Sequence, residues 1–391
     1  MLTTPFSPWP SFTEEESDAV RQVLLSNQVN YWTGSECSEF EKEFATWANT
    51  RHAVALSNGT VALDLALKAL DVGRGDEVVV TPRTFIASAS AIVNAGAVPV
   101  FVDVDADSGN ITAATIERVL TSRTKAIICV HLAGWPCDMD PIMALAEWHG
   151  VKMIEDCAQA HGARYKGRSV GSIGHLGAWS FCQDKIMTTG GEGGMVTTND
   201  KDLWSHVWSF KDHGKSYDAV YKRKHPPGFR WLHESFGSNY RMTEMQAAIG
   251  RIQLKRMPVW HEQRVSNANR IWHCARELPG LRVPDVPSYV EHAAYKCYVY
   301  VRLEQLRSGW SRDRIIQEVN DRGVPCYSGT CSEVYMEKAF EGTGWRPTER
   351  LPVAKELGET SLMFLVHPTL TEAEIQKSCD VLSEVMYLAT S

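Results

Sequence analysis

Lys185 lies in a stretch whose composition could make it a chemical reagent. In AWSFCQDKIMTTGGEGGMVTTND, which begins at residue 178, the lysine follows a run with the pattern of a β-strand, and four glycines come within the next nine residues. Glycines let the backbone pass close to a bound molecule, so the loop could make room for a reaction partner of the amine. The same residues are also compatible with a surface turn that carries a solvated lysine.

The segment ALSNGTVALDLALKAL, from residue 55, has the pattern of a strand, a tight turn and a helix. Gly59 would let the backbone approach a ligand, and Thr60 opens a helix whose free N–H groups attract an anion such as phosphate. Ser, Asn and Thr also serve simply as helix caps. This turn is therefore compatible with a phosphate site and with ordinary capping.

Two acidic residues, Glu155 and Asp156, end a hydrophobic strand in VKMIEDCAQAHGA. Successive side chains of a strand point to opposite faces, so one of the two points inward. A buried carboxylate is costly unless a cation pairs with it, and a protonated ring nitrogen would be such a cation. The alternative is an aspartate that caps the following loop.

A third polar segment, FGSNYRMTEMQAAIG, places Asn239 and Arg241 just before a helix. Taken alone, it indicates a loop asparagine with a helix-capping role.

The elements that must position these residues alternate between strand and helix. Strand patterns are followed by helical patterns over residues 52–158, which indicates crossover connections and a mostly parallel sheet with helices on both faces. Ligands bind outside the carboxyl ends of the strands in such sheets. The segments that follow the strands are 57–60, 81–85, 131–135, 156–161 and the Lys185 loop. We expect these segments to meet at one edge.

The pattern changes near residue 240. A long helical stretch, which contains Pro258, leads to Pro279-Gly280 and then to further strand and helix patterns. We therefore expect a large domain over residues 1–259 and a smaller C-terminal α+β domain over residues 260–391.

Composition excludes several classes of protein. The chain has 391 residues and a net charge of −7, so it lacks the basic excess of a nucleic-acid-binding protein. Its ten cysteines have no paired spacing, and we expect neither a disulfide framework nor a metal site. The uncharged stretch 85–102 contains Ser, Asn, Gly and Pro and indicates a buried helix, a turn and a strand rather than a membrane span. The N-terminus has no signal-peptide pattern, so a cytoplasmic location is expected.

Four blocks of the sequence together resemble one family over nearly the whole chain. They are WTG with EFEKEFATWANTRHAVALSNGTVAL, GDEVVVTPRTFIASASAIVNAGAVPVFVDVD, IEDCAQAHGARYKGRSVGSIGHLGAWSF with the following lysine, and GSNYRMTEMQAAIG. In this order and spacing they resemble the DegT/StrS-type sugar aminotransferases, a branch of the fold-type-I pyridoxal-phosphate enzymes. The resemblance implies an α/β, aspartate aminotransferase-like fold and pyridoxal 5′-phosphate as cofactor, with pyridoxamine phosphate as its alternate form.

The resemblance implies a role for each candidate residue. Lys185 would form the Schiff base with the cofactor, and Asp156 would pair with the pyridine nitrogen and keep it protonated. Gln159 would lie near the 3′-oxygen of the ring, and Phe85 would stack on the ring. The phosphate would be held by Gly59, Thr60 and Ser180, and by Asn239 of the neighbouring subunit.

The resemblance also implies the reaction and the partners. An amino donor, L-glutamate, would supply nitrogen for a nucleotide-linked keto-sugar, of the 4-keto-6-deoxy type or the 3-keto type, in surface-polysaccharide or amino-sugar biosynthesis. The expected assembly is a homodimer with shared active sites. Alternatives are a sugar dehydratase, which in relatives has His in place of the lysine, and a non-catalytic protein that only binds the cofactor.

Two segments depart from the family pattern. KIMTTGGEGG has one glycine more than many relatives, which could shift the loop beyond Lys185. GVPCYSGTCSEVYMEKAF differs from the commoner form, which leaves the sugar open. Cys331 and Tyr335 could line a pocket there, but a packed helix start is the simpler interpretation.

Overall fold

The computed structural model of the protein describes residues 5–390. Its central element is a seven-stranded sheet. In spatial order the strands are β1 (His52–Leu56), β9 (Gly194–Thr198), β8 (Leu176–Ser180), β5 (Lys152–Asp156), β4 (Thr124–Val130), β2 (Glu77–Val80) and β3 (Val98–Phe101). Only β9 in this sheet pairs antiparallel, with β1 and β8. The mostly parallel sheet predicted from the alternation of strands and helices is confirmed.

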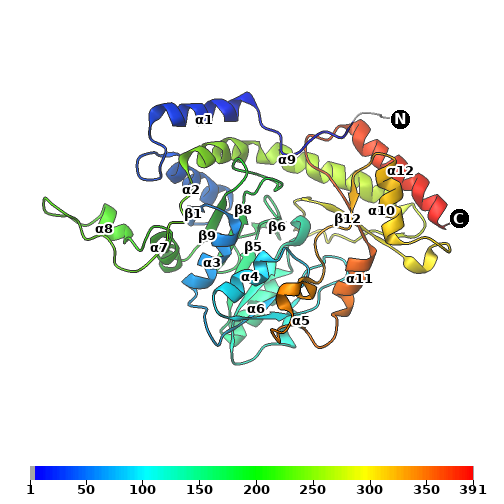
Figure 1. The fold of residues 1–391 in the computed structure, drawn as a ribbon, viewed down its shortest axis with the longest axis horizontal. Coiled ribbons are helices and arrows are strands. Elements are labelled where there is room, and N and C mark those ends of the chain that lie inside the picture. The colour runs from blue at the N-terminus through cyan, green and yellow to red at the C-terminus, as the bar shows by residue number, and fades with distance from the viewer. Residues whose placement is uncertain (1–4, 391) are drawn as a thin grey trace.

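Helices cover both faces of this sheet, because its strands are apolar on both sides (Figure 1). On β2, Val78 and Val80 join a core with residues of the helices that follow β1 and β2, while Val79 joins a second core with Ile142 of a later helix. The helices around the sheet are α1 (Glu14–Ser26), α2 (Glu36–Trp47), α3 (Gly59–Ala69), α4 (Ala87–Asn94), α5 (Ala113–Glu117), α6 (Met139–His149), α7 (Lys201–Phe210) and α8 (Tyr217–Tyr221). The helix, turn and strand expected over residues 85–102 are α4 and β3.

The C-terminal part has a smaller sheet of its own. Its strands, all antiparallel, are β10 (Leu281–Arg282), β12 (Cys297–Val301), β14 (Ser361–Phe364) and β13 (Cys326–Tyr327), in that order. The accompanying helices are α10 (Arg312–Asp321), α11 (Pro352–Thr360) and α12 (Glu372–Thr390). A third, small sheet consists of β11 (Val290–Glu291), β6 (Arg164–Tyr165) and β7 (Arg168–Ser169).

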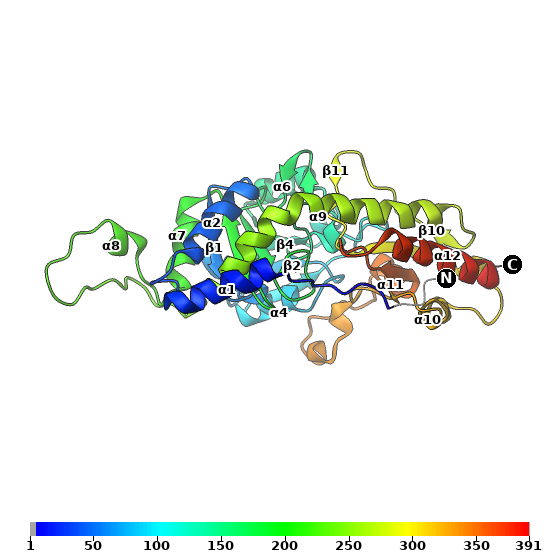
Figure 2. The same ribbon diagram turned by 90° about the horizontal axis from the view of Figure 1, so that it is seen from above.

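Helix α9 (Glu244–Arg276) runs along both parts of the molecule (Figure 2). It begins at a capping box in which Thr243 and Gln246 satisfy each other's free backbone groups. Pro258 lies inside it, one residue before the predicted domain boundary. The division into residues 1–259 and 260–391 therefore cuts a single helix and stays a prediction.

An arm around α8 extends away from the body of the molecule (Figures 1 and 2). The bridge between Lys215 and His233 holds the base of the arm together. Two large apolar side chains of the arm are strongly exposed, Phe229 (77%) and Trp231 (80%), and so is Phe236 (99%) just beyond its base. Across residues 5–390, no helix is long and apolar enough to cross a membrane.

Candidate active site

The candidate residues meet at the carboxyl edge of the parallel strands. Asp156 is the last residue of β5 and Ser180 the last of β8, and these neighbouring strands are parallel with Asp156 opposite Ala178. The segment 81–85 follows β2 at the same edge, and α3 begins directly beyond β1. The edge predicted from the order of strands and helices is therefore present.

Asp156 is a buried carboxylate that faces this edge. Its Oδ2 accepts a hydrogen bond from Ser88 Oγ at 2.8 Å, and its Oδ1 accepts one from the Ala158 N–H at 3.1 Å. Burial raises the pKa of Asp156, while these two hydrogen bonds and the positive charge of Lys185 favour the ionised form. A cation placed against Asp156 would therefore be strongly stabilised.

Glu155, the preceding residue, points to the opposite face of the sheet. Its carboxylate accepts hydrogen bonds from His131 Nε2 at 2.9 Å and from the backbone N–H groups of Gly171, Ile173 and Gly174 at 2.7–2.9 Å. His131 Nδ1 in turn accepts from the Cys137 N–H at 3.0 Å. Cys157 lies close enough for the three side chains to resemble a metal-ligand set. Because both His131 nitrogens and both Glu155 oxygens are already hydrogen-bonded, we interpret the group as a hydrogen-bond network.

Lys185 lies in the loop that follows β8. Its Nζ is 5.3 Å from the centre of the Tyr295 ring, and its carbonyl oxygen accepts a hydrogen bond from Trp9 Nε1 at 2.8 Å. The loop beyond it closes through a bridge between Cys182 and Gly191. Gly191 has a φ of +121°, which favours glycine, so the glycine-rich departure from the family pattern has a local conformational cause.

The start of α3 and the end of β8 form a cradle. A Cβ placed on Gly59 would lie 2.5 Å from Ser180 Cβ, so only glycine allows this approach. Asn58 caps the helix by accepting from the Val61 N–H at 3.0 Å, and Thr60 lies in the first turn. The remaining N–H groups of that turn are available to an anion at this edge.

Phe85 and Gln159 flank the same edge. The ring of Phe85 is 66% exposed although it follows a fully buried strand. Gln159 is buried, and its Oε1 accepts from the Ala133 N–H at 2.9 Å, which leaves its Nε2 free to donate. A flat apolar ligand with an oxygen at its rim could use both side chains.

Asn239 lies in a segment that runs beside the end of β1, since the Ser57 N–H donates to the Tyr240 carbonyl at 2.9 Å. It pairs with Asp212 through an isolated backbone bridge, its side chain is exposed, and no hydrogen bond of that side chain is found among residues 5–390. Cys331 and Tyr335, in the C-terminal segment that differs from the family pattern, lie in different environments. Tyr335 is buried and donates to Glu333, while Cys331 is exposed.

Comparison with known proteins identifies the family of the chain. The family model described as "DegT/DnrJ/EryC1/StrS aminotransferase family" matches residues 10–383. The chain belongs to this aminotransferase family. It is 37% identical to the GDP-perosamine synthase of Caulobacter vibrioides, over 96% of this chain and 97% of that protein. It is 35% identical to the UDP-N-acetyl-3-dehydro-alpha-D-glucosamine 3-aminotransferase of Acidithiobacillus ferrooxidans, over 93% and 92%.

A solved structure gives the same fold in detail. The aminotransferase from Psychrobacter cryohalolentis is 65% identical, with a TM-score of 0.97 over 99% of this chain and 100% of that one. The fold type inferred from the sequence resemblance is thus confirmed.

Members of the family depend on pyridoxal phosphate, and the residues at the edge fit that group. The cradle at α3 could take the phosphate, and the exposed Phe85 ring could cover the flat face of the pyridine. The buried Asp156 could pair with the ring nitrogen, and Lys185 supplies an amine in the adjoining loop.

Sequence reasoning missed three contacts. Ser88 was detectable in principle, as a hydroxyl that comes one helical turn after Phe85 in an otherwise apolar run. Trp9 and Tyr295 carried no local signal, because they reach Lys185 from distant parts of the chain.

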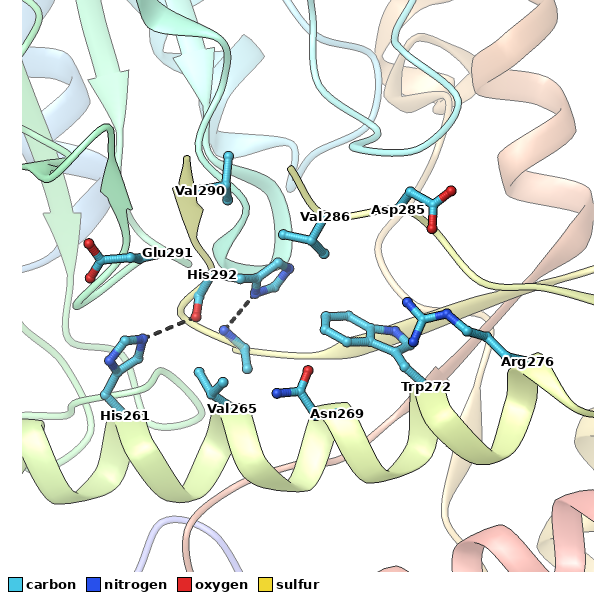
Figure 3. Close-up of a pocket in the computed structure, with 11 residues that line it drawn as sticks. His261, Val265, Asn269, Trp272, Arg276, Asp285, Val286, Val290, Glu291 and His292 are labelled. Carbon is cyan, nitrogen blue, oxygen red and sulfur yellow. Dashed lines mark hydrogen bonds between the residues drawn. The ribbon is translucent and has the colours of Figure 1, made fainter. Parts of the chain in front are cut away.

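A cavity of about 470 Å³ lies elsewhere, along α9 (Figure 3). His292 faces it and accepts from the Ala294 N–H at 2.7 Å, so its other nitrogen carries the proton. Burial lowers the pKa of His292 to about 3, so the ring stays neutral. None of the predicted site residues lines this cavity.

Proposed function

We propose that this protein transfers an amino group from L-glutamate to a nucleotide-linked keto-sugar. The observation that carries the proposal is the meeting of Lys185, Asp156 and the α3 cradle at one sheet edge. The family match supports the reaction type. Both relatives named above carry the names of enzymes for nucleotide-linked sugars, which supports the acceptor class.

We assign the cofactor contacts as follows. Lys185 holds the cofactor covalently, and Asp156 holds a proton on its ring nitrogen. Gly59, Thr60 and Ser180 bind the phosphate, Phe85 covers the ring, and Gln159 donates its free Nε2 to the ring oxygen. When bound, pyridoxal phosphate supplies an electron sink and carries the amino group between the two half-reactions.

The chain's own residues then perform the proton chemistry. The Lys185 amine, freed when the donor binds, would take a proton from the substrate carbon that bears the nitrogen and deliver it to the cofactor carbon on the other side of that nitrogen. Asp156 stays ionised beside the protonated nitrogen and stabilises the charge that collects there. Ser88 keeps the carboxylate oriented for this task through its 2.8 Å hydrogen bond.

The acceptor is a 4-keto-6-deoxy sugar or a 3-keto sugar. The test loads the purified protein with L-glutamate, removes the excess donor, and screens keto-sugars linked to GDP, UDP and dTDP by mass spectrometry. Formation of an amino sugar supports the proposal. A cofactor spectrum that does not respond to glutamate would indicate a passive binding protein, and loss of water from the sugar would indicate a dehydratase.

We also infer that two chains complete each site. The exposed aromatic side chains of the α8 arm and the free side chain of Asn239 support a homodimer in which Asn239 reaches the phosphate of the neighbouring subunit. A cytoplasmic location is part of the same proposal, and fractionation of cells that make the protein tests it.

A further inference from the structure

Arg83 is an arginine whose hydrogen-bonding capacity is largely unused. It follows β2 at the reactive edge and is 0% exposed. Its Nη1 donates to Ser332 Oγ at 2.7 Å, but its Nε and Nη2 have no hydrogen-bond partner. Arginine stays charged in proteins, so a buried guanidinium with free N–H groups indicates a missing acceptor.

The protein supplies no carboxylate for this charge. Among residues 5–390, no acidic side chain forms an ion pair with Arg83, whose guanidinium carbon lies 5.1 Å from the centre of the Tyr298 ring. Acidic residues of the neighbouring segments already have cationic partners, since Asp107 pairs with Arg282 and Glu333 with Arg350. A buried charge without a counter-ion is costly, so Arg83 is suited to a ligand rather than to the folded core.

The position of Arg83 connects it to the reaction. Its neighbour Thr84 forms a 2.9 Å hydrogen bond with Ser88, and Ser88 donates to Asp156. On the other side, the segment that contains Ser332 covers Arg83, and the Val334 N–H donates to the Pro82 carbonyl at 2.9 Å. Arg83 thus lies between the candidate cofactor site and a segment of the C-terminal part.

We propose that Arg83 binds a carboxylate of the amino donor during the first half-reaction. The planar guanidinium offers two parallel N–H groups, which match the two oxygens of a carboxylate. The carboxylate binds Nε and Nη2, the two groups without a partner, while Ser332 keeps its hydrogen bond from Nη1. This inference rests on the proposed function, because an amino acid is the donor only in that reaction. A phosphate of the acceptor nucleotide has similar chemistry, and the experiment separates the two.

The experiment compares the wild-type holoenzyme with the variants Arg83→Gln, Arg83→Lys and Arg282→Gln. Arg282 is a matched control, because its guanidinium also packs on a tyrosine of β12, at 4.4 Å from the Tyr300 ring, but it has a carboxylate partner. The two half-reactions are followed separately by the cofactor spectrum. Arg83→Gln should raise the half-saturating glutamate concentration roughly 10- to 100-fold, as expected for lost hydrogen bonds to a charged group, with a smaller effect on the limiting rate.

The results of these assays distinguish the donor carboxylate from the nucleotide phosphate as the anion that Arg83 binds. Arg83→Lys keeps the positive charge but not the two parallel N–H groups. Its half-saturating glutamate concentration should therefore lie between those of wild type and Arg83→Gln, while Arg282→Gln should leave glutamate saturation unchanged. If Arg83→Gln weakens only the half-reaction with the nucleotide sugar, the anion is a phosphate and the proposal is wrong. The proposal is also wrong if glutamate saturation in Arg83→Gln equals that of wild type.

A binding measurement gives a readout independent of turnover. Glutarate has the carboxylates of glutamate but no amino group, so it cannot react. It should raise the melting temperature of the wild-type holoenzyme and not that of Arg83→Gln, and without glutarate Arg83→Gln should be at least as stable as wild type. A lower melting temperature in Arg83→Gln with unchanged glutarate binding would make Arg83 structural and overturn the proposal. If wild type binds glutarate but does not react with glutamate, the proposed function fails while the anion site stands.

Discussion

Asp156 is the buried carboxylate of the candidate site, and burial opposes its charged form. Its carboxylate is withdrawn from water, and two hydrogen bonds and the charge of Lys185 offset only part of that cost. A protonated ring nitrogen would therefore balance the charge of this buried carboxylate.

Asp156→Asn should lower the rate of amino transfer about a thousandfold, because the neutral amide no longer stabilises a protonated nitrogen. The cofactor-free variant should melt at the same temperature as cofactor-free wild type or higher. Burial raises the pKa of Asp156, so its charged form reduces stability once the pH exceeds the pKa of the folded state, and Asn removes that cost. Steady-state rates and thermal melts check both parts. A rate within about threefold of wild type would mean that Asp156 only caps its loop.

Borohydride reduction of the holoenzyme should fix the cofactor to a peptide that contains Lys185. Lys296 is the control, because its Nζ lies 4.7 Å from the same Tyr295 ring that Lys185 approaches at 5.3 Å. Burial lowers the pKa of Lys296 to about 8, so its amine is also reactive near neutral pH. Mass spectrometry should show label in Lys296→Ala and none in Lys185→Ala. Label on Lys296 would contradict the assignment.

At the scale of single residues, the sequence predicted those candidate site residues that belong to a local strand-and-turn motif. Asp156, Ser180 and Gly59 follow strands, so the order of the sheet places them at one edge. The free guanidinium of Arg83 was not predictable, because its isolation depends on which distant acids pair with other arginines.

At the scale of elements, the strand ends are fixed by buried polar contacts. Glu155 joins β5 to His131 at the end of β4 and to the turn 171–174 that leads into β8. Burial opposes its charged form, but hydrogen bonds from His131 and from the backbone of Gly174 and Gly171 hold the pKa of Glu155 below its usual value. The same network therefore holds the strands that carry Asp156 and Ser180.

Glu155→Gln should cost about 1.5–3 kcal/mol of unfolding free energy at pH 7, the loss expected when hydrogen bonds to a buried charged group are removed. Because the folded-state pKa is lowered, the contribution of Glu155 is present above its ordinary pKa and is lost as the pH falls through the lowered value. The variant should therefore lose less stability on acidification than wild type. Urea denaturation at several pH values checks this.

The exposed pair Glu39–Lys42 supplies the control for that measurement. Glu39→Gln should change stability little, since surface ion pairs are screened by water. If Glu155→Gln behaves like Glu39→Gln, the network does not hold the strands.

Most elements of the sheet could be predicted, because strands buried on both faces and helices with one apolar side have different periods. The alternation predicted over residues 52–158 is present in β1 to β5, with α5 as a short additional helix between β3 and β4. The reversed direction of β9 was not predicted, because direction depends on the length and course of the loop that contains Lys185 rather than on the residues of the strand.

At the scale of the whole molecule, the exposed arm and the Asn239 side chain are the features that support the proposed dimer. Large aromatic side chains that extend into water from an arm are typical of an interaction surface. Neither feature has a local sequence signature, because each would be completed only by the second chain of the proposed dimer.

Mixing Lys185→Ala with Asn239→Ala should restore activity if sites are shared. Each single variant should be nearly inactive at low cofactor concentration. In a mixed dimer both lesions fall in one site and leave the other native, so random mixing should return about a quarter of wild-type activity. Refolding the two variants together and assaying the mixture checks this. Activity no higher than the sum of the separate variants would place Asn239 in its own chain's loop.

The hydrogen bond between Trp9 and the carbonyl of Lys185 has a consequence for the order of synthesis. Trp9 also packs on Trp260 and His367, and Ser7 donates to Glu374, so the segment beside the lysine loop is held in part by residues more than 350 positions later. Contacts of such long sequence separation form late, so this segment takes its final place only after residue 374 has been synthesised. A nascent chain that stalls before residue 367 lacks these contacts and should retain the cofactor less well than the full chain.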